Sequence, residues 1–168
     1  MTLKISSLLT FSLLVSTALF LTTSCKKSNS GGGSSNSISA TIGGSGWSTT
    51  IPTQAIYATN GQEFEIIGGS YKAGDTTALA VAFTTPFPLN KPISSEDANV
   101  DIGYINAKTL AEYDGGIQAG HSILTVTSWD SVNHKIAGTF TGVLYNTSGG
   151  SDSLVVTNGN FNTTYLVQ

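Results

Sequence analysis

Several residue types are scarce in this chain of 168 residues, and each scarcity excludes a class of protein. The chain has no Arg, so its seven basic residues are all Lys, and ten acidic residues give a net charge of -3. The basic face that a nucleic-acid-binding protein needs is therefore missing. One Cys excludes a disulfide within the chain, and together with only two His it excludes the usual zinc cluster. We expect no metal and no other cofactor.

Charge is also scarce, while small and hydroxylated residues are abundant. Charged residues make up 10% of the chain, against about 25% in an average soluble protein. The chain contains 19 Gly, 22 Ser and 23 Thr, a composition that favours turns and strands over helices. The length suits one compact domain.

The N-terminus has the layout of a secretory signal. Lys4 precedes an apolar and hydroxyl-rich run over residues 5–21, and small residues follow up to Cys25. Ser and Thr interrupt the run, so a permanent transmembrane helix of about 20 strongly apolar residues explains it less well. The arrangement resembles a bacterial lipoprotein signal, in which cleavage before a Cys leaves that residue to carry lipid. Ser24 fits that pattern, although Thr22 stands where such signals usually have Leu.

These features divide the chain into three parts. We predict a lipoprotein signal peptide over residues 1–24, a lipidated Cys25 with a Gly/Ser-rich tether over 25–37, and one domain over 38–168. Several acyl chains on Cys25 would anchor the protein stably in a membrane. The alternative is an ordinary thiol after an ordinary signal peptide, but free Cys is uncommon in exported chains.

Within the domain, apolar residues recur with the period of two that is typical of strands. In residues 77–83 large side chains alternate with Ala78, Ala80 and Ala82, and in 136–145 the residues Ile136, Phe140 and Leu144 share a face. Similar alternation predicts about eight or nine strands, the others lying over 38–42, 55–59, 63–72, 100–105, 123–129, 154–161 and 163–167.

Turn residues separate these strands. Asn60-Gly61, Gly74-Asp75 and Gly149-Gly150 predict tight antiparallel hairpins. Asn158-Gly159 inside a strand pattern predicts a β-bulge, and three prolines in 86–92 predict a long connection. Residues 107–113 fit a short helix or a further strand. The fold class is all-β, an antiparallel β-sandwich or partly open barrel.

The domain is similar to small β-sheet lipoproteins of the Bacteroidota, a family without a known activity. The residues that carry the resemblance are Gly46-Trp47, Thr125-Val126-Thr127 with Trp129-Asp130, Gly138-Thr139-Phe140, and Thr157-Asn158-Gly159 with Phe161. The resemblance implies a lipid-anchored protein of the cell envelope, at the outer membrane. The residues after Cys25 are Lys-Lys-Ser-Asn rather than an acidic run resembling a surface-export signal, so we expect the periplasmic side.

Residues suited to catalysis or metal binding are present but do not form a recognisable motif. His121 and His134 lack a Gly-x-Ser-x-Gly nucleophile motif. Glu63 and Glu65, about 6.6–6.8 Å apart along a strand, have the spacing of a glycosidase pair but fit the solvent face of an amphipathic strand. Glu96, Asp97 and Asp101 could offer oxygen ligands to Ca²⁺, yet a solvated acidic loop explains them more simply. We expect no enzymatic activity.

Two further features concern recognition and modification. By strand parity Trp129 lies opposite Leu124 and Val126 and should point away from the core, which makes it the candidate contact for a ligand or partner. Thr76, Ser131 and Ser153 each follow an Asp in a pattern that resembles the O-glycosylation sites of exported Bacteroidota proteins.

Two functions remain open from the sequence. One is a non-catalytic β-sandwich that binds or scaffolds an envelope protein or glycan, anchored to the membrane by its lipid. The other is a barrel-like carrier of a small apolar ligand. The orientation of Ala78, Ala80 and Ala82 discriminates between them, because a carrier would turn this smooth face toward an internal cavity.

Overall fold

The computed structural model describes residues 36–72, 74–98, 100–116 and 121–168. This part of the chain is all-β apart from a single helical turn, α2 (Ser95–Ala98). Its twelve strands are β1 (Ser37–Ile42), β2 (Ser45–Ser48), β3 (Ile51–Ala58), β4 (Glu63–Lys72), β5 (Asp75–Thr84), β6 (Ile93–Ser94), β7 (Asp101–Asn106), β8 (Ala111–Asp114), β9 (His121–Asp130), β10 (Lys135–Asn146), β11 (Ser153–Thr164) and β12 (Leu166–Val167).

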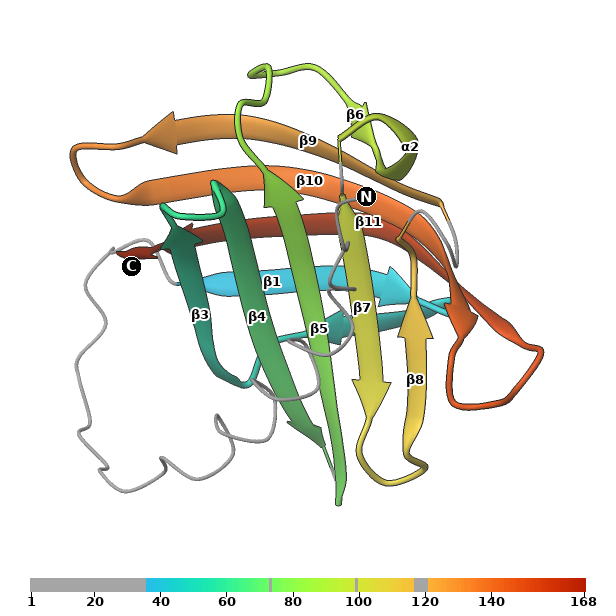
Figure 1. The fold of residues 1–168 in the computed structure, drawn as a ribbon. Helices are drawn as coiled ribbons and strands as arrows, with labels where there is room; N and C mark the ends of the chain where they lie inside the picture. Colours follow the sequence, from blue (N-terminus) through green and yellow to red (C-terminus); the bar gives the residue numbers. More distant parts are fainter. Residues whose placement is uncertain (1–35, 73, 99, 117–120) are drawn as a thin grey trace, which may run out of the picture. The chain divides into compact units, whose positions relative to one another are not determined.

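The strands form one open sheet that folds into two layers. Along the hydrogen-bonded path the order is β12-β3-β4-β5-β7-β8-β10-β11-β1-β2, with β9 beside β10 and β6 beside β9. Figure 1 shows β3, β4, β5, β7 and β8 running across the direction of β9, β10, β11 and β1. The expected sandwich or partly open barrel is confirmed, with more strands than the eight or nine predicted.

Two corners connect the layers. β10 pairs with β9 from Lys135 to Val143, but its last residues, Tyr145 and Asn146, pair with β8 of the other layer. At the second corner the chain passes from β2 to β3, where the Thr49 amide donates to Ile38 and the Thr50 amide donates to Gly69. Strands that change layer in this way are typical of orthogonally packed sheets.

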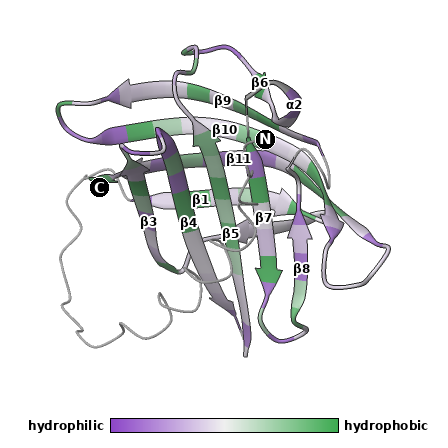
Figure 2. Cartoon of the chain, in the orientation of Figure 1, coloured by the Kyte–Doolittle hydropathy of each residue, from purple (hydrophilic) through white to green (hydrophobic). Residues whose placement is uncertain are grey.

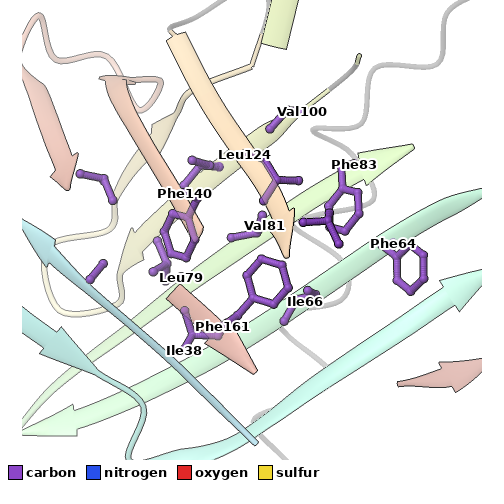
Figure 3. Packing of buried hydrophobic residues seen from close by; sticks show 14 of the residues in the cluster. Ile38, Phe64, Ile66, Leu79, Val81, Phe83, Val100, Leu124, Phe140 and Phe161 are labelled. Carbon is purple, nitrogen blue, oxygen red and sulfur yellow. The ribbon is translucent and has the colours of Figure 1, made fainter. Parts of the chain in front are cut away.

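Large side chains from both layers fill the space between them. Figure 3 shows Phe64, Ile66, Leu79, Val81 and Phe83 of one layer facing residues of the other, among them Ile38, Leu124, Phe140 and Phe161. All nine are at most 2% exposed. The core is thus packed by side chains in the way that protein interiors usually are.

Two glycines let the aromatic residues of β10 and β11 lie flat across the strand pair. Phe140 is opposite Gly159, and Phe161 is opposite Gly138. A methyl group on Gly159 would collide with the ring and carbonyl of Phe140, and one on Gly138 would collide with the ring of Phe161. Beside Gly159, Asn158 has a φ of 51°, and the pairing of β10 with β11 shifts there, which confirms the predicted bulge.

The other local predictions are confirmed in most places. Gly74 and Gly149 have positive φ at hairpin turns, whereas in the β3–β4 turn the positive φ falls on Gln62 and not on Gly61. Residues 107–113, which fitted a helix or a strand, contain a turn and the start of β8. The connection predicted over 86–92 is present as residues 85–92, between β5 and the two-residue β6.

The alanine face of β5 lies on the outside of its layer. Leu79, Val81 and Phe83 are wholly buried on the core side, and the alternation of the strand therefore turns Ala78, Ala80 and Ala82 to the other face. Figure 2 shows that β5 is hydrophobic or neutral along most of its length. This smooth face does not line the interior of the sandwich.

Candidate functional site

An aromatic cluster closes one end of the sandwich, and Trp129 lies at its rim. The centroid of the Trp129 ring is 5.3 Å from that of the Phe87 ring. It is 6.1 Å from the centroid of the Phe64 ring, which it meets edge-on. Its indole N–H donates a hydrogen bond of 2.9 Å to the hydroxyl of Tyr165. Tyr165 itself meets Phe64 edge-on at 5.1 Å, so the cluster joins β4, β9, the 85–92 connection and the C-terminal segment.

The expected outward orientation of Trp129 is wrong, and a bulge in β9 is the reason. β9 and β10 shift register between Ala137 and Gly138, which leaves Thr127 without a directly opposite residue. One extra residue reverses the alternation of a strand. Trp129 therefore lies opposite the buried Ile136, on the core side, where it remains 39% exposed.

No turn residue marks this second bulge, unlike the first. The bulge in β11 is marked by Asn158-Gly159, whereas the segment Thr127-Ser128 of β9 contains no glycine. The partners of Trp129 come from three separate segments, with Phe64, Phe87 and Tyr165 spread over a hundred residues. Local alternation could therefore not have predicted the cluster.

A second group of polar side chains lies on the outer face of the other layer. Strand register places Glu65, Ala82 and Asp101 in one row across β4, β5 and β7. Burial and the neighbouring carboxylate of Asp114 raise the pKa of Asp101 to about 7, and the carboxyl of Asp101 also hydrogen-bonds to that of Asp114. Oδ1 of Asp101 is buried and has no hydrogen-bond partner.

The two glutamates of β4 have a related electrostatic environment. Burial raises the pKa of Glu63, and burial followed by repulsion from Glu63 raises the pKa of Glu65. Both lie on the outer face of β4 and alternate with the buried Phe64 and Ile66 of the core face. This is the amphipathic arrangement that the sequence indicates.

The structure does not assemble the calcium ligands considered from the sequence. Oε1 of Glu96 is 3.2 Å from Nδ1 of His121, and both side chains are largely exposed. Asp101 instead contacts Asp114, and the side chain of Asp97 is outside the described part. Among the described residues no group of three His, Cys, Asp or Glu side chains could hold a metal ion.

In the described part of the chain, the contacts of the two histidines are with Glu96 and with Tyr165. The ring of His134 stacks on Tyr165 at 5.2 Å, and His134 has a φ of 50° in the β9–β10 turn. Ser122, next to His121, donates its hydroxyl to the carbonyl of Gly115 at 2.7 Å. His121 pairs with Glu96, not with Glu112 or Asp114 upstream of it.

The remaining predicted sites fall at the surface or outside the described residues. Ser131 is exposed in the β9–β10 turn, Ser153 is exposed as the first residue of β11, and Thr76 is half-buried as the second residue of β5. Cys25 lies outside the described residues. None of the helices in the described segments is long and apolar enough to cross a membrane.

Comparison of the chain with protein-family models, with curated proteins and with solved structures finds no match. The resemblance to lipoproteins of the Bacteroidota therefore stays a prediction, and the function rests on the residues themselves.

Proposed function

We propose that this chain is a cell-envelope lipoprotein whose β domain binds or scaffolds another envelope component without catalysis. A lipid on Cys25 would anchor it to the outer membrane, on the periplasmic side. The observation that carries the proposal is the filled interior, in which Phe64, Phe83, Phe140 and Phe161 occupy the space between the layers. A domain packed in this way offers a partner its outer surface.

The same observation favours a binding module over a carrier of an apolar ligand. A carrier needs small side chains around an internal cavity, but Ala78, Ala80 and Ala82 are on the outer face of β5, opposite the buried Leu79 and Val81. Emptying the core for a ligand would require several fully buried large side chains to move.

Trp129 stays the candidate contact residue within this proposal. Its ring is held by Phe87 and by the hydrogen bond to Tyr165, so it loses little conformational freedom when a partner covers its exposed edge. Aromatic residues held in this way often supply much of the energy of an interface. The partner classes that fit are an envelope protein or a glycan.

Replacement of Cys25 by Ala tests the anchor. The variant should move from the membrane fraction to the soluble periplasmic fraction, because it lacks the thiol that carries the lipid. A matched control, Lys26→Ala with Lys27→Ala, should stay with the membrane. Continued detergent-dependent fractionation of Cys25→Ala would show that the anchor lies elsewhere.

Purification from the native envelope separates the binding module from the carrier. Native mass spectrometry of the lipidated protein should find no small apolar molecule bound in a one-to-one ratio. Such a molecule, retained through purification and released only on unfolding, would overturn the binding module and support the carrier.

A further inference from the structure

The end of the domain where the chain enters is fixed by hydrogen bonds. The side-chain amide of Asn36 donates to Oγ1 of Thr164 at 3.1 Å, and the backbone amide of Thr164 donates to Oδ1 of Asn36 at 3.0 Å. Thr164 pairs with Lys135, which pairs with Asp130 at the base of the β9–β10 hairpin. With neighbouring strands about 4.8 Å apart, Asn36 lies about 14 Å from that hairpin.

Exposed apolar side chains gather at this same end. Val132, in the hairpin turn, is 87% exposed, Leu166 and Val167 of β12 are 68% and 47% exposed, and Trp129 is 39% exposed. The amide of Tyr165 donates to the carbonyl of His134 at 2.9 Å, which holds the start of β12 beside the hairpin. We call these four residues, Trp129, Val132, Leu166 and Val167, the entry-end patch.

The length of chain before the domain keeps this end near any lipid on Cys25. Ten residues lie between Cys25 and Asn36, and even a fully extended chain over these eleven residue steps spans less than about 40 Å. Val155, another exposed apolar residue, is nine positions before Thr164 on β11. It therefore lies about 30 Å along the strand from the entry end.

We propose that the entry-end patch docks on the surface of the lipid bilayer to which Cys25 anchors the chain. This inference rests on the proposed lipid anchor and assigns the exposed edge of Trp129 to lipid in place of a protein or glycan. Trp and aliphatic side chains are favourable in the interfacial region of a bilayer. In the β9–β10 hairpin, Asp130 pairs with Lys135, so the negative and positive charges of these two residues cancel. Apolar contact therefore supplies the attraction between the patch and the bilayer.

A spin label at position 132 tests the docking in the full lipidated protein. Lipidation occupies Cys25, so Val132→Cys gives one free thiol, and Val155→Cys gives the matched control at the far end of β11. Both proteins are reconstituted into vesicles of neutral phosphatidylcholine, and the collision rates of the label with oxygen and with a water-soluble nickel complex are compared.

Docking predicts that the label at 132 is shielded from nickel and accessible to oxygen, while the label at 155 stays accessible to nickel. Adding Leu166→Asp and Val167→Asp should reduce the shielding at 132 by at least about tenfold, because two apolar side chains then no longer transfer to lipid. Addition of anionic lipid or of salt should change the shielding little.

The possible failures are distinguishable. If the protein floats with the vesicles but the labels at 132 and 155 are equally accessible to nickel, docking is overturned and the lipid anchor stands. If shielding at 132 appears only with anionic lipid, the apolar mode of docking is overturned. If the lipid is absent and the protein does not float, the anchor and the docking that rests on it both fail.

Discussion

The two layers of the sheet cover the same core but differ in the charge of the side chains on their outer faces. In one layer a row across β4, β5 and β7 contains Glu65, Ala82 and Asp101. In the other a row across β9, β10, β11 and β1 contains only neutral hydrogen-bonding residues, namely Thr125, Thr139, Asn160 and Ser39.

The difference shows that alternation fixes the inner face of a strand and leaves the outer face free to vary. A carboxylate placed beside another on a sheet can raise its neighbour's pKa, as Asp114 raises the pKa of Asp101. Hydroxyl and amide groups instead satisfy one another, as when the Asn160 amide donates to Oγ of Ser39 at 2.8 Å. Between about pH 4 and pH 7, stability should therefore depend on pH through the layer that contains Asp101.

The largest expected effect tests what the layers share. Phe140 lies in the layer of β9, β10, β11 and β1, which we call the neutral layer, and Phe83 lies in the layer of β4, β5 and β7, which we call the acidic layer. Phe140→Ala and Phe83→Ala should each reduce the free energy of unfolding by about 3–5 kcal/mol, because each empties a fully packed site. Denaturant melts measure both losses. A loss below about 1 kcal/mol for either variant would show that its layer does not contribute to the common core.

The next effect distinguishes the layers by pH. Asp101 titrates near 3.8 when unfolded and near 7 when folded, so between these values the folded state holds the extra proton. Stability should fall as the pH rises from about 4 to about 7. Asp101→Asn should remove most of this slope and stabilise the protein at pH 8 by about 2–4 kcal/mol.

Melts of Asp101→Asn at several pH values check this expectation, with Asn160→Asp as the control. The control places a carboxyl in the neutral layer, where no acidic residue belongs to the row, and should leave the slope of the parent protein in place. A parent protein whose stability is flat between pH 4 and 7 would contradict the electrostatic difference between the layers.

Trp129 tests the place where the layers meet. Trp129→Ala should cost about 2–3 kcal/mol, less than a fully buried aromatic residue, because the ring is partly exposed yet contacts Phe64 and Phe87. Trp129→Phe keeps a ring but loses the hydrogen bond to Tyr165 and should cost about 1 kcal/mol. A melting temperature unchanged by Trp129→Ala would mean that the indole does not join the layers.

The smallest effect concerns the neutral outer face. Thr139→Ala and Thr141→Ala should each change the free energy of unfolding by less than about 1 kcal/mol, since both side chains are exposed. Comparing them with Phe140→Ala in the same melts checks the register of β10 directly. Losses larger than that of Phe140→Ala would mean that β10 turns its other face to the core.

Much of the fold could be predicted from the sequence because strand alternation is a local property. The predicted span 63–72 coincides with β4, and 136–145 lies within β10. The buried position of Phe140 and the bulge at Asn158-Gly159 were also predictable. β2 and β6 were not identified as strands, and the segment of β8 fitted a helix or a strand, because each of the three has at most four residues, too few to show a period.

Contacts that depend on distant segments were decided only by the tertiary structure. The bulge in β9, which no glycine marks, turns Trp129 inward. There it contacts residues of β4, the 85–92 connection and the C-terminal segment. The pairing of β7 with β8 brings Asp101 to Asp114, although alternation alone gives each only an outward direction. The sequence by itself determined which residues alternate and where turns are energetically favourable. Register and layer packing determined which side chains meet, because register and packing each depend on the whole sheet.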